Sequence, residues 1–148
     1  MRRVIKIGIC KKSSQKIHEV DVIEVISGKG IVDDRHFKED NDDGNQITLI
    51  ESENIDYYNK ETNTSIPYID FRRNIITTGI KLNDLIGKKM KIGSVIIEAK
   101  DLCRPCKHLQ EMIARDDIVK KFIFKGGLRC KIISSGKIHK GDQISINL

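Results

Sequence analysis

The sequence predicts a mainly β protein, a closed or partly open β-barrel with a few short helices. Short runs rich in Val and Ile recur along its 148 residues, and several alternate apolar with polar side chains, as half-buried strands do. Turn-forming Gly, Asn and Asp residues separate many of these runs. Most runs are not followed by a helical segment, which argues against a parallel α/β sheet and favours a barrel or sandwich.

The strand predictions depend on β-branched residues and on alternation. RVIKIGIC at 3–10 is rich in Ile, and IHEVDVIEVI at 17–26 alternates more clearly. In KMKIGSVIIEAK at 89–100, Gly93 indicates a turn. In chain order, we predict strands within residues 3–10, 17–26, 45–50, 73–78, 89–100, 128–134 and 143–148.

Two segments, 51–62 and 105–115, have the apolar spacing of helices instead. In the first, Ser52 is the predicted N-cap and Ile55 belongs to the buried stripe. In the second, Pro105 suits the first turn of a helix, where its missing N–H group costs nothing.

Length, composition and charge limit the function classes. The length indicates one domain, residues 1–148, large enough to bury a core without disulfides or metal. We expect a cytoplasmic protein with reduced thiols and no membrane association, because no signal peptide or membrane span is present and four cysteines are too few for a disulfide scaffold. A net charge of +6 is compatible with plain solubility or with an anionic small-molecule ligand. Nucleic acid is disfavoured, since the three Tyr and four Phe are not interleaved with basic residues.

The segment DLCRPCKHL at 101–109 contains the most reactive candidate, Cys106. If Pro105 begins a helix, the helix N–H groups and dipole favour the thiolate form of Cys106. Positive potential is added by the neighbours Arg104, Lys107 and His108. Because the thiolate is both the nucleophile and the metal-binding form of cysteine, Cys106 is a candidate for catalysis and for metal ligation.

The other cysteines are open to different interpretations. Cys103 is either the disulfide partner of Cys106 or the last inward-facing residue of the strand that ends near Ala99. Cys10 and Cys130 lie in apolar strands and are expected to be small buried side chains. A structural zinc site needs four ligands, and no second Cys or His pair completes one.

Three further stretches, in order, make the sequence resemble the MOSC family, named for the C-terminal domain of molybdenum cofactor sulfurase. GKGIVDDRHF at 28–37 contains Asp-Arg-His, and residues 71–106 contain Arg-Arg-Asn, a Gly-x-x-Leu turn, a strand and the cysteine. Residues 127–146 contain Gly-Leu-Arg followed by Gly-x-Ile-x-x-Gly-Asp. The resemblance extends from about residue 4 to the C-terminus. In one departure, Asp33 stands where the family usually has Gly.

This resemblance implies a β-barrel, a MOSC-like single domain, in which a cysteine carries persulfide sulfur or ligates molybdenum. By position, Cys106 matches the family's cysteine. Its other motif positions correspond to Arg35, His36, Arg73, Asn74 and Arg129. In the full-length sulfurase the domain follows a pyridoxal-phosphate desulfurase domain, which this chain lacks. Pyridoxal phosphate would therefore belong to a partner cysteine desulfurase, and molybdoenzymes are further candidate partners.

The residue chemistry agrees with an anionic cofactor. A soft thiolate suits molybdenum, and planar arginine side chains suit the phosphate of the pterin. We expect the molybdenum cofactor (molybdopterin) to be bound near the ends of several strands, where the arginines can converge at a barrel mouth. The candidates are Arg35, Arg72, Arg73, Arg104 and Arg129, with Asn74.

Two histidines remain candidates with two interpretations each. His36 is either an acid or base or a residue that hydrogen-bonds its loop, and His108 either tunes Cys106 or faces solvent. Two other functions also stay open. One is a thiol–disulfide oxidoreductase that uses Cys103 and Cys106, and the other is a polyanion-binding module. Whether the protein is a catalyst or a carrier is not decided by its sequence.

Overall fold

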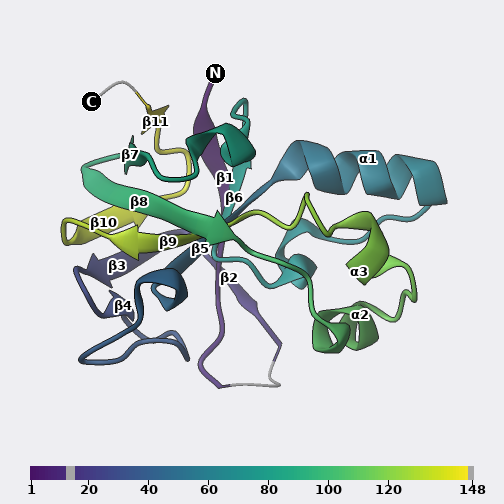
Figure 1. The fold of residues 1–148 in the computed structure, drawn as a ribbon, viewed down its shortest axis with the longest axis horizontal. Coiled ribbons are helices and arrows are strands. Elements are labelled where there is room, and N and C mark those ends of the chain that lie inside the picture. Colours follow the sequence, from purple (N-terminus) through teal and green to yellow (C-terminus); the bar gives the residue numbers. More distant parts are fainter. Residues whose placement is uncertain (13–15, 147–148) are drawn as a thin grey trace.

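In the computed structural model, residues 1–12 and 16–146 are described. The longest sheet contains eight strands in the order β11-β7-β8-β9-β5-β6-β1-β2, and a smaller one has the order β10-β3-β4 (Figure 1). The strands are β1 (Arg3–Ile9), β2 (His18–Val20), β3 (Val22–Ile26), β4 (Gly30–Ile31), β5 (Ile47–Glu51), β6 (Ile75–Thr78), β7 (Lys89–Ile92), β8 (Val95–Leu102), β9 (Leu128–Ile132), β10 (Gly136–His139) and β11 (Ile144–Ser145).

The large sheet curls strongly, and hydrogen bonds near its two edges narrow the opening. Val4 N–H donates to the Asp142 carbonyl (2.9 Å), and Gly141 N–H donates to the Val4 carbonyl (2.8 Å). Next to them, Ile144 N–H donates to the Arg2 carbonyl (3.1 Å). The segment leading into β11 therefore meets the start of β1, which confirms the predicted partly open barrel. Closing a sheet in this way removes exposed edges that would otherwise pair with other chains.

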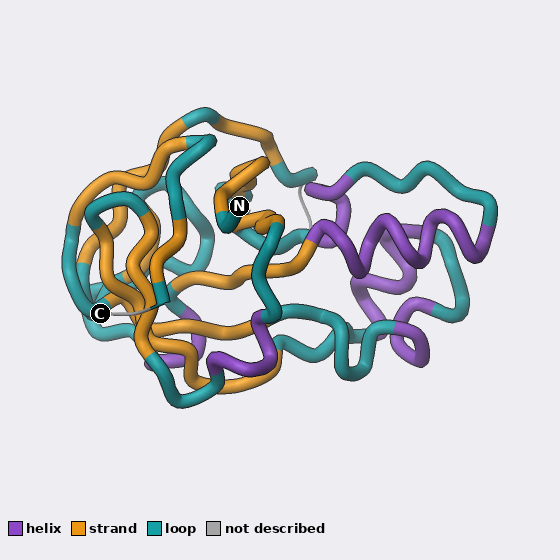
Figure 2. The backbone as a smooth tube through the Cα atoms, turned by 90° about the horizontal axis from the view of Figure 1, so that it is seen from above, coloured by secondary structure: helices purple, strands orange, loops and turns teal. Residues whose placement is uncertain are grey.

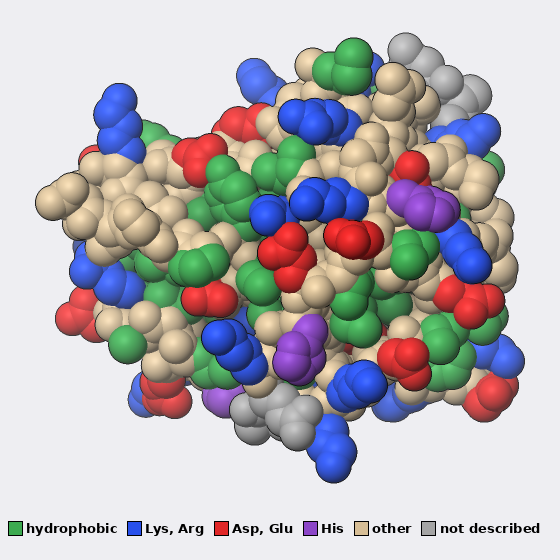
Figure 3. Space-filling view, turned by 180° about the vertical axis from the view of Figure 1, so that it is seen from behind, with side chains coloured by type: hydrophobic (Ala, Val, Ile, Leu, Met, Phe, Trp, Pro, Cys, Tyr) green, Lys and Arg blue, Asp and Glu red, His purple; other side chains and the backbone are tan. Residues whose placement is uncertain are grey.

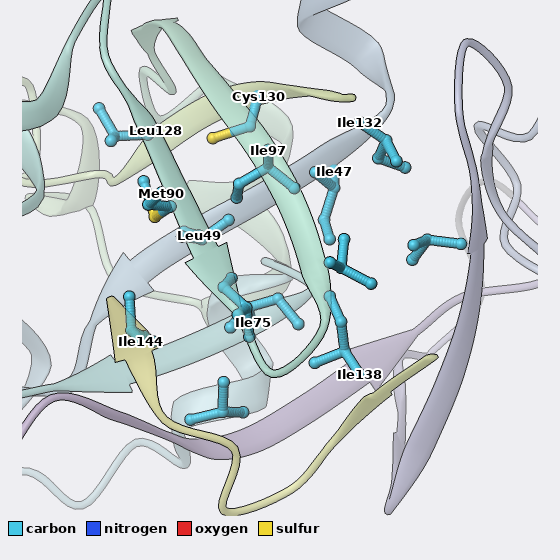
Figure 4. Close-up of a cluster of buried hydrophobic side chains, with 14 of the residues drawn as sticks. Ile47, Leu49, Ile75, Met90, Ile97, Leu128, Cys130, Ile132, Ile138 and Ile144 are labelled. Carbon is cyan, nitrogen blue, oxygen red and sulfur yellow. The ribbon is translucent and has the colours of Figure 1, made fainter. Parts of the chain in front are cut away.

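The inward side chains of the curled sheet form the main core (Figure 4). The burial of β7 and β8 alternates, because successive side chains of a strand point to opposite faces. Ile97 and Cys130 are completely inaccessible in this core, so the prediction of a buried Cys130 is confirmed. Burial raises the pKa of the Cys130 thiol strongly, which keeps it protonated.

The helices gather on one side of the barrel (Figure 2). The chain also has short 3-10 turns, η1 (Asp43–Asn45), η2 (Tyr68–Phe71) and η3 (Leu82–Leu85); the helices themselves are α1 (Ser52–Thr62), α2 (Lys107–Ile113) and α3 (Ile118–Lys121). A second apolar cluster joins the helices to the outer face of the sheet through residues such as Ile50, Ile55, Phe71, Leu109 and Phe122. Within the described residues, no helix has the length and apolar character needed to span a membrane.

Several predicted boundaries are wrong for identifiable reasons. The predicted strand 17–26 is divided at Asp21, because β2 pairs with β1 whereas β3 pairs with β10 and β4. Ser52 is the first residue of α1 rather than its N-cap, which is Glu51. Pro105 precedes α2, and Cys106 itself is the N-cap. At the C-terminus only Ile144–Ser145 pair as a strand, and the predicted residues 147–148 lie outside the described part.

The side chain of Asn74 joins three strands at the end of the barrel where β6 begins. Its Nδ2 donates to the Gly8 carbonyl (3.1 Å), and its Oδ1 accepts bonds from the Thr48 N–H (3.0 Å) and hydroxyl (3.1 Å). Asn74 is buried, so these bonds replace water contacts that the side chain has lost. The predicted ligand-binding residue Asn74 therefore also holds the barrel end together.

Replacing Asn74 by Ala should lower the free energy of unfolding by about 2–4 kcal/mol, because it removes three hydrogen bonds and leaves buried partners unpaired. Urea unfolding followed by circular dichroism measures this loss. Asn83→Ala is the matched control, since exposed Asn83 donates one surface bond to the Phe124 carbonyl. It should cost less than about 1 kcal/mol. Equal losses in the two variants would contradict the structural role of Asn74.

Candidate functional site

A cavity of about 450 Å³ lies where several strands of the barrel begin or end. Its wall contains Cys10 after β1, Asn74 before β6, Leu102 at the end of β8 and Arg129 in β9. The pairing of β8 with β9 shifts register between Ala99 and Asp101, a bulge of the kind that re-aims side chains beside binding sites. Segments far apart in the sequence therefore share one hollow.

All five predicted arginines line this cavity. They are Arg35, Arg72, Arg73, Arg104 and Arg129. Within the described residues, the side chains of Arg35 and Arg104 have no hydrogen bond or ion pair with protein groups. Within the described residues, Arg129 uses only its Nε, which donates to the Gly44 carbonyl (3.0 Å). Most of the N–H groups of these three side chains can therefore be offered to an anion.

Arg73 differs, because it is buried and bonded to backbone carbonyls on three sides. Its Nε donates to Gly126 (2.9 Å), one terminal nitrogen donates to Phe71 (3.2 Å) and the other donates to Cys103 (3.2 Å). These carbonyls offset part of the cost of removing the cation from water. Arg73 thus fixes the entry to the Cys-x-x-Cys segment and brings positive charge to the cavity wall.

Two residues beside the cavity have left-handed backbone conformations. The φ angle is 70° at Asp33 and 63° at Arg72. Glycine adopts this region freely and Asp tolerates it better than most residues, which explains how Asp33 can occupy the position where the resembling motif has Gly. Asp34 then anchors the turn, because its carboxylate accepts the N–H groups of Cys10 (3.0 Å) and His36 (3.3 Å).

Three cysteines line the cavity, and they differ in exposure. Cys106 is exposed, and its Sγ accepts the Leu109 N–H (3.4 Å) as the N-cap of α2. Cys103 is half-buried, and burial raises the pKa of its thiol although Arg73 and Arg129 act in the opposite direction. The structure therefore separates the accessible thiol of Cys106 from one that is held protonated.

Cys10 is buried as expected, but it also lines the cavity, which sequence reasoning missed. Its Sγ donates to the Lys12 carbonyl (2.9 Å), and an Arg72 nitrogen lies 3.6 Å from the sulfur. Other missed wall residues are Ile17, Gly44, Asn45, Thr48 and Asp101. The available signal was position, because Cys10 and Asp101 both stand near the end of a predicted strand.

The two candidate histidines have different surroundings. His36 lies at the cavity wall, whereas His108 is exposed on α2 and is not among the wall residues. The pKa of His36 is lowered, chiefly by its partial withdrawal from water and also by the Arg35 and Arg72 charges, while Asp34 acts in the opposite direction. His36 is therefore neutral near pH 7 and can donate one hydrogen bond and accept another.

Across residues 1–12 and 16–146, no group of three or more His, Cys, Asp or Glu side chains could hold a metal ion. The structure thus provides no ligand set for a structural zinc site. A metal that arrives with most of its ligands already attached would need only one protein sulfur, and Cys106 is accessible for that.

We expect the pKa of His36 in the folded protein to lie below 6.5 and to rise when an anion enters the cavity. As the pH falls below 6.5, the unfolded chain takes up this proton first, so the His36 contribution lowers stability in acid. NMR titration of the ring, with and without inorganic phosphate, measures both effects. Between pH 7 and pH 5, urea unfolding should show that His36→Gln loses less free energy of unfolding than the wild-type protein does. A His36 pKa at or above 6.5 in the free protein would contradict this prediction.

Comparisons with known proteins agree with this geometry. Residues 33–145 match the MOSC domain, and no curated protein matches the chain. The YuaD protein from Bacillus subtilis superposes with a TM-score of 0.81 at 18% identity, covering 97% of this chain and 96% of YuaD. YiiM from Geobacillus stearothermophilus has a TM-score of 0.80 at 15% identity, covering 100% of this chain and 76% of that YiiM.

YiiM from Escherichia coli is also similar, with a TM-score of 0.74 at 18% identity, covering 100% of this chain and 70% of that YiiM. At these identities the solved structures show a shared fold and no more. The domain match is stronger evidence, because it includes the Asp-Arg-His, Arg-Arg-Asn, cysteine and Gly-Leu-Arg segments that build the cavity. Since that match covers well over half of the sequence, the chain belongs to the MOSC domain family.

Proposed function

We propose that this protein is a molybdenum cofactor-binding or sulfur-carrier module whose reactive group is Cys106. One observation carries the proposal: an exposed cysteine opens onto a cavity lined by five arginines. MOSC domains are generally linked to the molybdenum cofactor, and membership of the family supports the same ligand here. The site combines a soft donor with several anion-binding groups, which is the combination that this cofactor requires.

The residues of the cavity fit the cofactor's chemistry. Its phosphate is suited to arginine, because the planar guanidinium can bond two oxygens at once. Arg35, Arg104 and Arg129 would hold the phosphate end, since their terminal nitrogens are not used by the protein within the described residues. Cys106 would contribute one soft ligand, and the dithiolene of the pterin would contribute others. When bound, molybdenum would supply redox-active metal chemistry at the cavity mouth.

The same cysteine suits sulfur transfer. The Cys106 thiolate would attack the terminal sulfur of a persulfide on a partner protein, such as a cysteine desulfurase. A new S–S bond would form on Cys106 while the S–S bond of the partner breaks, and the partner would leave as a thiolate. Exposure of Cys106 provides the access that this exchange needs, and the Leu109 N–H stabilises negative charge on Sγ.

Two other functions have less support from the geometry. A thiol–disulfide enzyme needs two thiols that exchange readily, yet Cys103 is half-buried and burial raises the pKa of its thiol. A polyanion-binding module would use the same arginines, but among the described residues the cavity wall contains no Phe or Tyr on which bases could stack. Measuring the reduction potential of the cysteine pair and the salt dependence of RNA binding tests these alternatives.

Cys106→Ala should abolish persulfide loading and reduce cofactor retention at least tenfold, while the protein remains folded. The reason is that no other exposed sulfur lines the cavity within the described residues. Peptide mass spectrometry after incubation with inorganic polysulfide locates the sulfur, and pterin fluorescence reports the retained cofactor. Cys103→Ala is the matched control and should still load, whereas persulfide found on Cys103 in wild-type protein would contradict the assignment.

Arg35→Ala and Arg129→Ala should each weaken cofactor binding about tenfold or more, because a hydrogen bond from a charged group contributes about 1.5–3 kcal/mol. Arg2→Ala, at an exposed position outside the cavity, should leave the affinity unchanged. Titration with the isolated cofactor measures the three affinities, and circular dichroism checks that each variant is folded. Equal affinities for all three variants would refute phosphate binding by these arginines.

A further inference from the structure

We propose that a short acidic segment of the sulfur-exchanging partner protein docks in a groove that leads from Cys106 past Ile17 and Arg72 to Met112. The inference rests on the proposed sulfur-carrier function, because it concerns the partner that Cys106 would meet. It adds the place of docking and the chemistry of the segment that docks. The groove consists of the arginine-lined cavity and a second hollow beside it.

The second hollow is about 350 Å³ and is lined by Lys16, Ile17, Asp70, Arg72 and Met112. It shares Ile17 and Arg72 with the arginine-lined cavity, so the two hollows adjoin along these side chains. Met112 lies on α2, the helix that Cys106 caps. The groove therefore has Cys106 near one end and Met112 near the other.

The helix sets the length of segment that fits. Met112 lies six positions after Cys106, which at about 1.5 Å per residue is roughly 9 Å along α2. An extended peptide advances about 3.3 Å per residue. The groove therefore suits the two or three residues that flank a cysteine persulfide entering the cavity.

The charge of the groove favours carboxylates. In the second hollow, Lys16 and Arg72 outnumber the single carboxylate of Asp70. In the cavity, five arginines face two carboxylates, Asp34 and Asp101, and both of these already accept backbone N–H groups. On the face seen in Figure 3, Lys and Arg side chains are interspersed with Asp and Glu. An excess of one sign in a hollow steers oppositely charged partners towards it.

The apolar part of the groove favours a peptide over a nucleic acid. Met112 is 40% exposed and Ile17 is buried beside it, so the hollow offers apolar surface to one side chain of the partner. Methionine adapts its shape to such contacts. Neither hollow is lined by Phe or Tyr among the described residues, and single-stranded nucleic acid usually stacks its bases on aromatic rings.

Two synthetic peptides of equal length test the proposal. Each contains one cysteine persulfide, flanked by Glu in the first peptide and by Lys in the second. Mass spectrometry follows sulfur transfer to Cys106 at low salt, and inorganic polysulfide serves as a small donor that needs no docking. We expect the Glu peptide to transfer sulfur at least tenfold faster than the Lys peptide, and the difference should shrink as salt screens the charges.

Lys16→Glu should reduce the preference for the Glu peptide about tenfold, because it reverses one charge of the second hollow. Lys137→Glu, an exposed change on β10 that lines neither hollow, should keep the wild-type preference. Met112→Asp should slow transfer from the Glu peptide in the same way as Lys16→Glu, since it adds a carboxylate to the groove.

Equal transfer from the two peptides, or an unchanged preference in Lys16→Glu, would overturn the docking proposal while polysulfide loading still supported the sulfur-carrier function. Failure of polysulfide to load Cys106 would overturn that function and the docking proposal together. Stronger inhibition of transfer by a short single-stranded RNA than by a persulfide-free Glu peptide would assign the groove to nucleic acid and overturn the peptide proposal.

Discussion

The site depends on the buried guanidinium of Arg73. It bonds the carbonyls of Phe71, Cys103 and Gly126, which belong to η2, to the segment after β8 and to the segment before β9. No carboxylate is paired with Arg73 within the described residues, so the carbonyl dipoles are its principal compensation. A lysine could not replace it, because a single ammonium group cannot reach three carbonyls in one plane. The position of Cys103 and the start of β9 both follow from this residue.

Burial separates the four cysteines into different chemical roles. Cys130 is sealed in the core and kept protonated, whereas Cys103 is half-buried with a raised pKa. Cys10 is buried but faces the cavity, and Cys106 is exposed. Water access alone therefore determines which sulfur can meet a partner or a soft metal. In the segment after β8, exposure changes within four residues, from the half-buried Cys103 to the exposed N-cap Cys106.

The fold and the cavity support different levels of conclusion. The curled sheet and the domain match establish membership of the MOSC family, while a shared fold by itself leaves chemistry open. The candidate chemistry comes from side chains: an accessible thiol, guanidinium groups with N–H donors that are unused within the described residues, and a neutral imidazole at the wall. The proposed docking groove beside α2 extends this reasoning, because sulfur exchange would need a surface that holds the donor as well as a nucleophile.

The sequence by itself determined the barrel class, the helical segments, the buried Cys130 and the set of five arginines. These follow from local patterns, since strand alternation, helical spacing and the order of the motifs can be read without knowing distant contacts. It could not determine that strand 17–26 changes sheets at Asp21, or that Pro105 lies before α2 rather than inside it.

Only the tertiary structure decided which side chains share the cavity and how their polar groups are used. Cys10 and Arg129 are far apart in the chain and line the same cavity because the curled sheet brings the ends of several strands together. Arg73 and Asn74 have much of their hydrogen-bonding capacity taken up by the backbone or by Thr48, whereas the Arg35 side chain makes no hydrogen bond or ion pair within the described residues. The hydrogen-bond partners and the burial of a side chain depend on which distant strands pair, and local sequence patterns contain no information about that pairing.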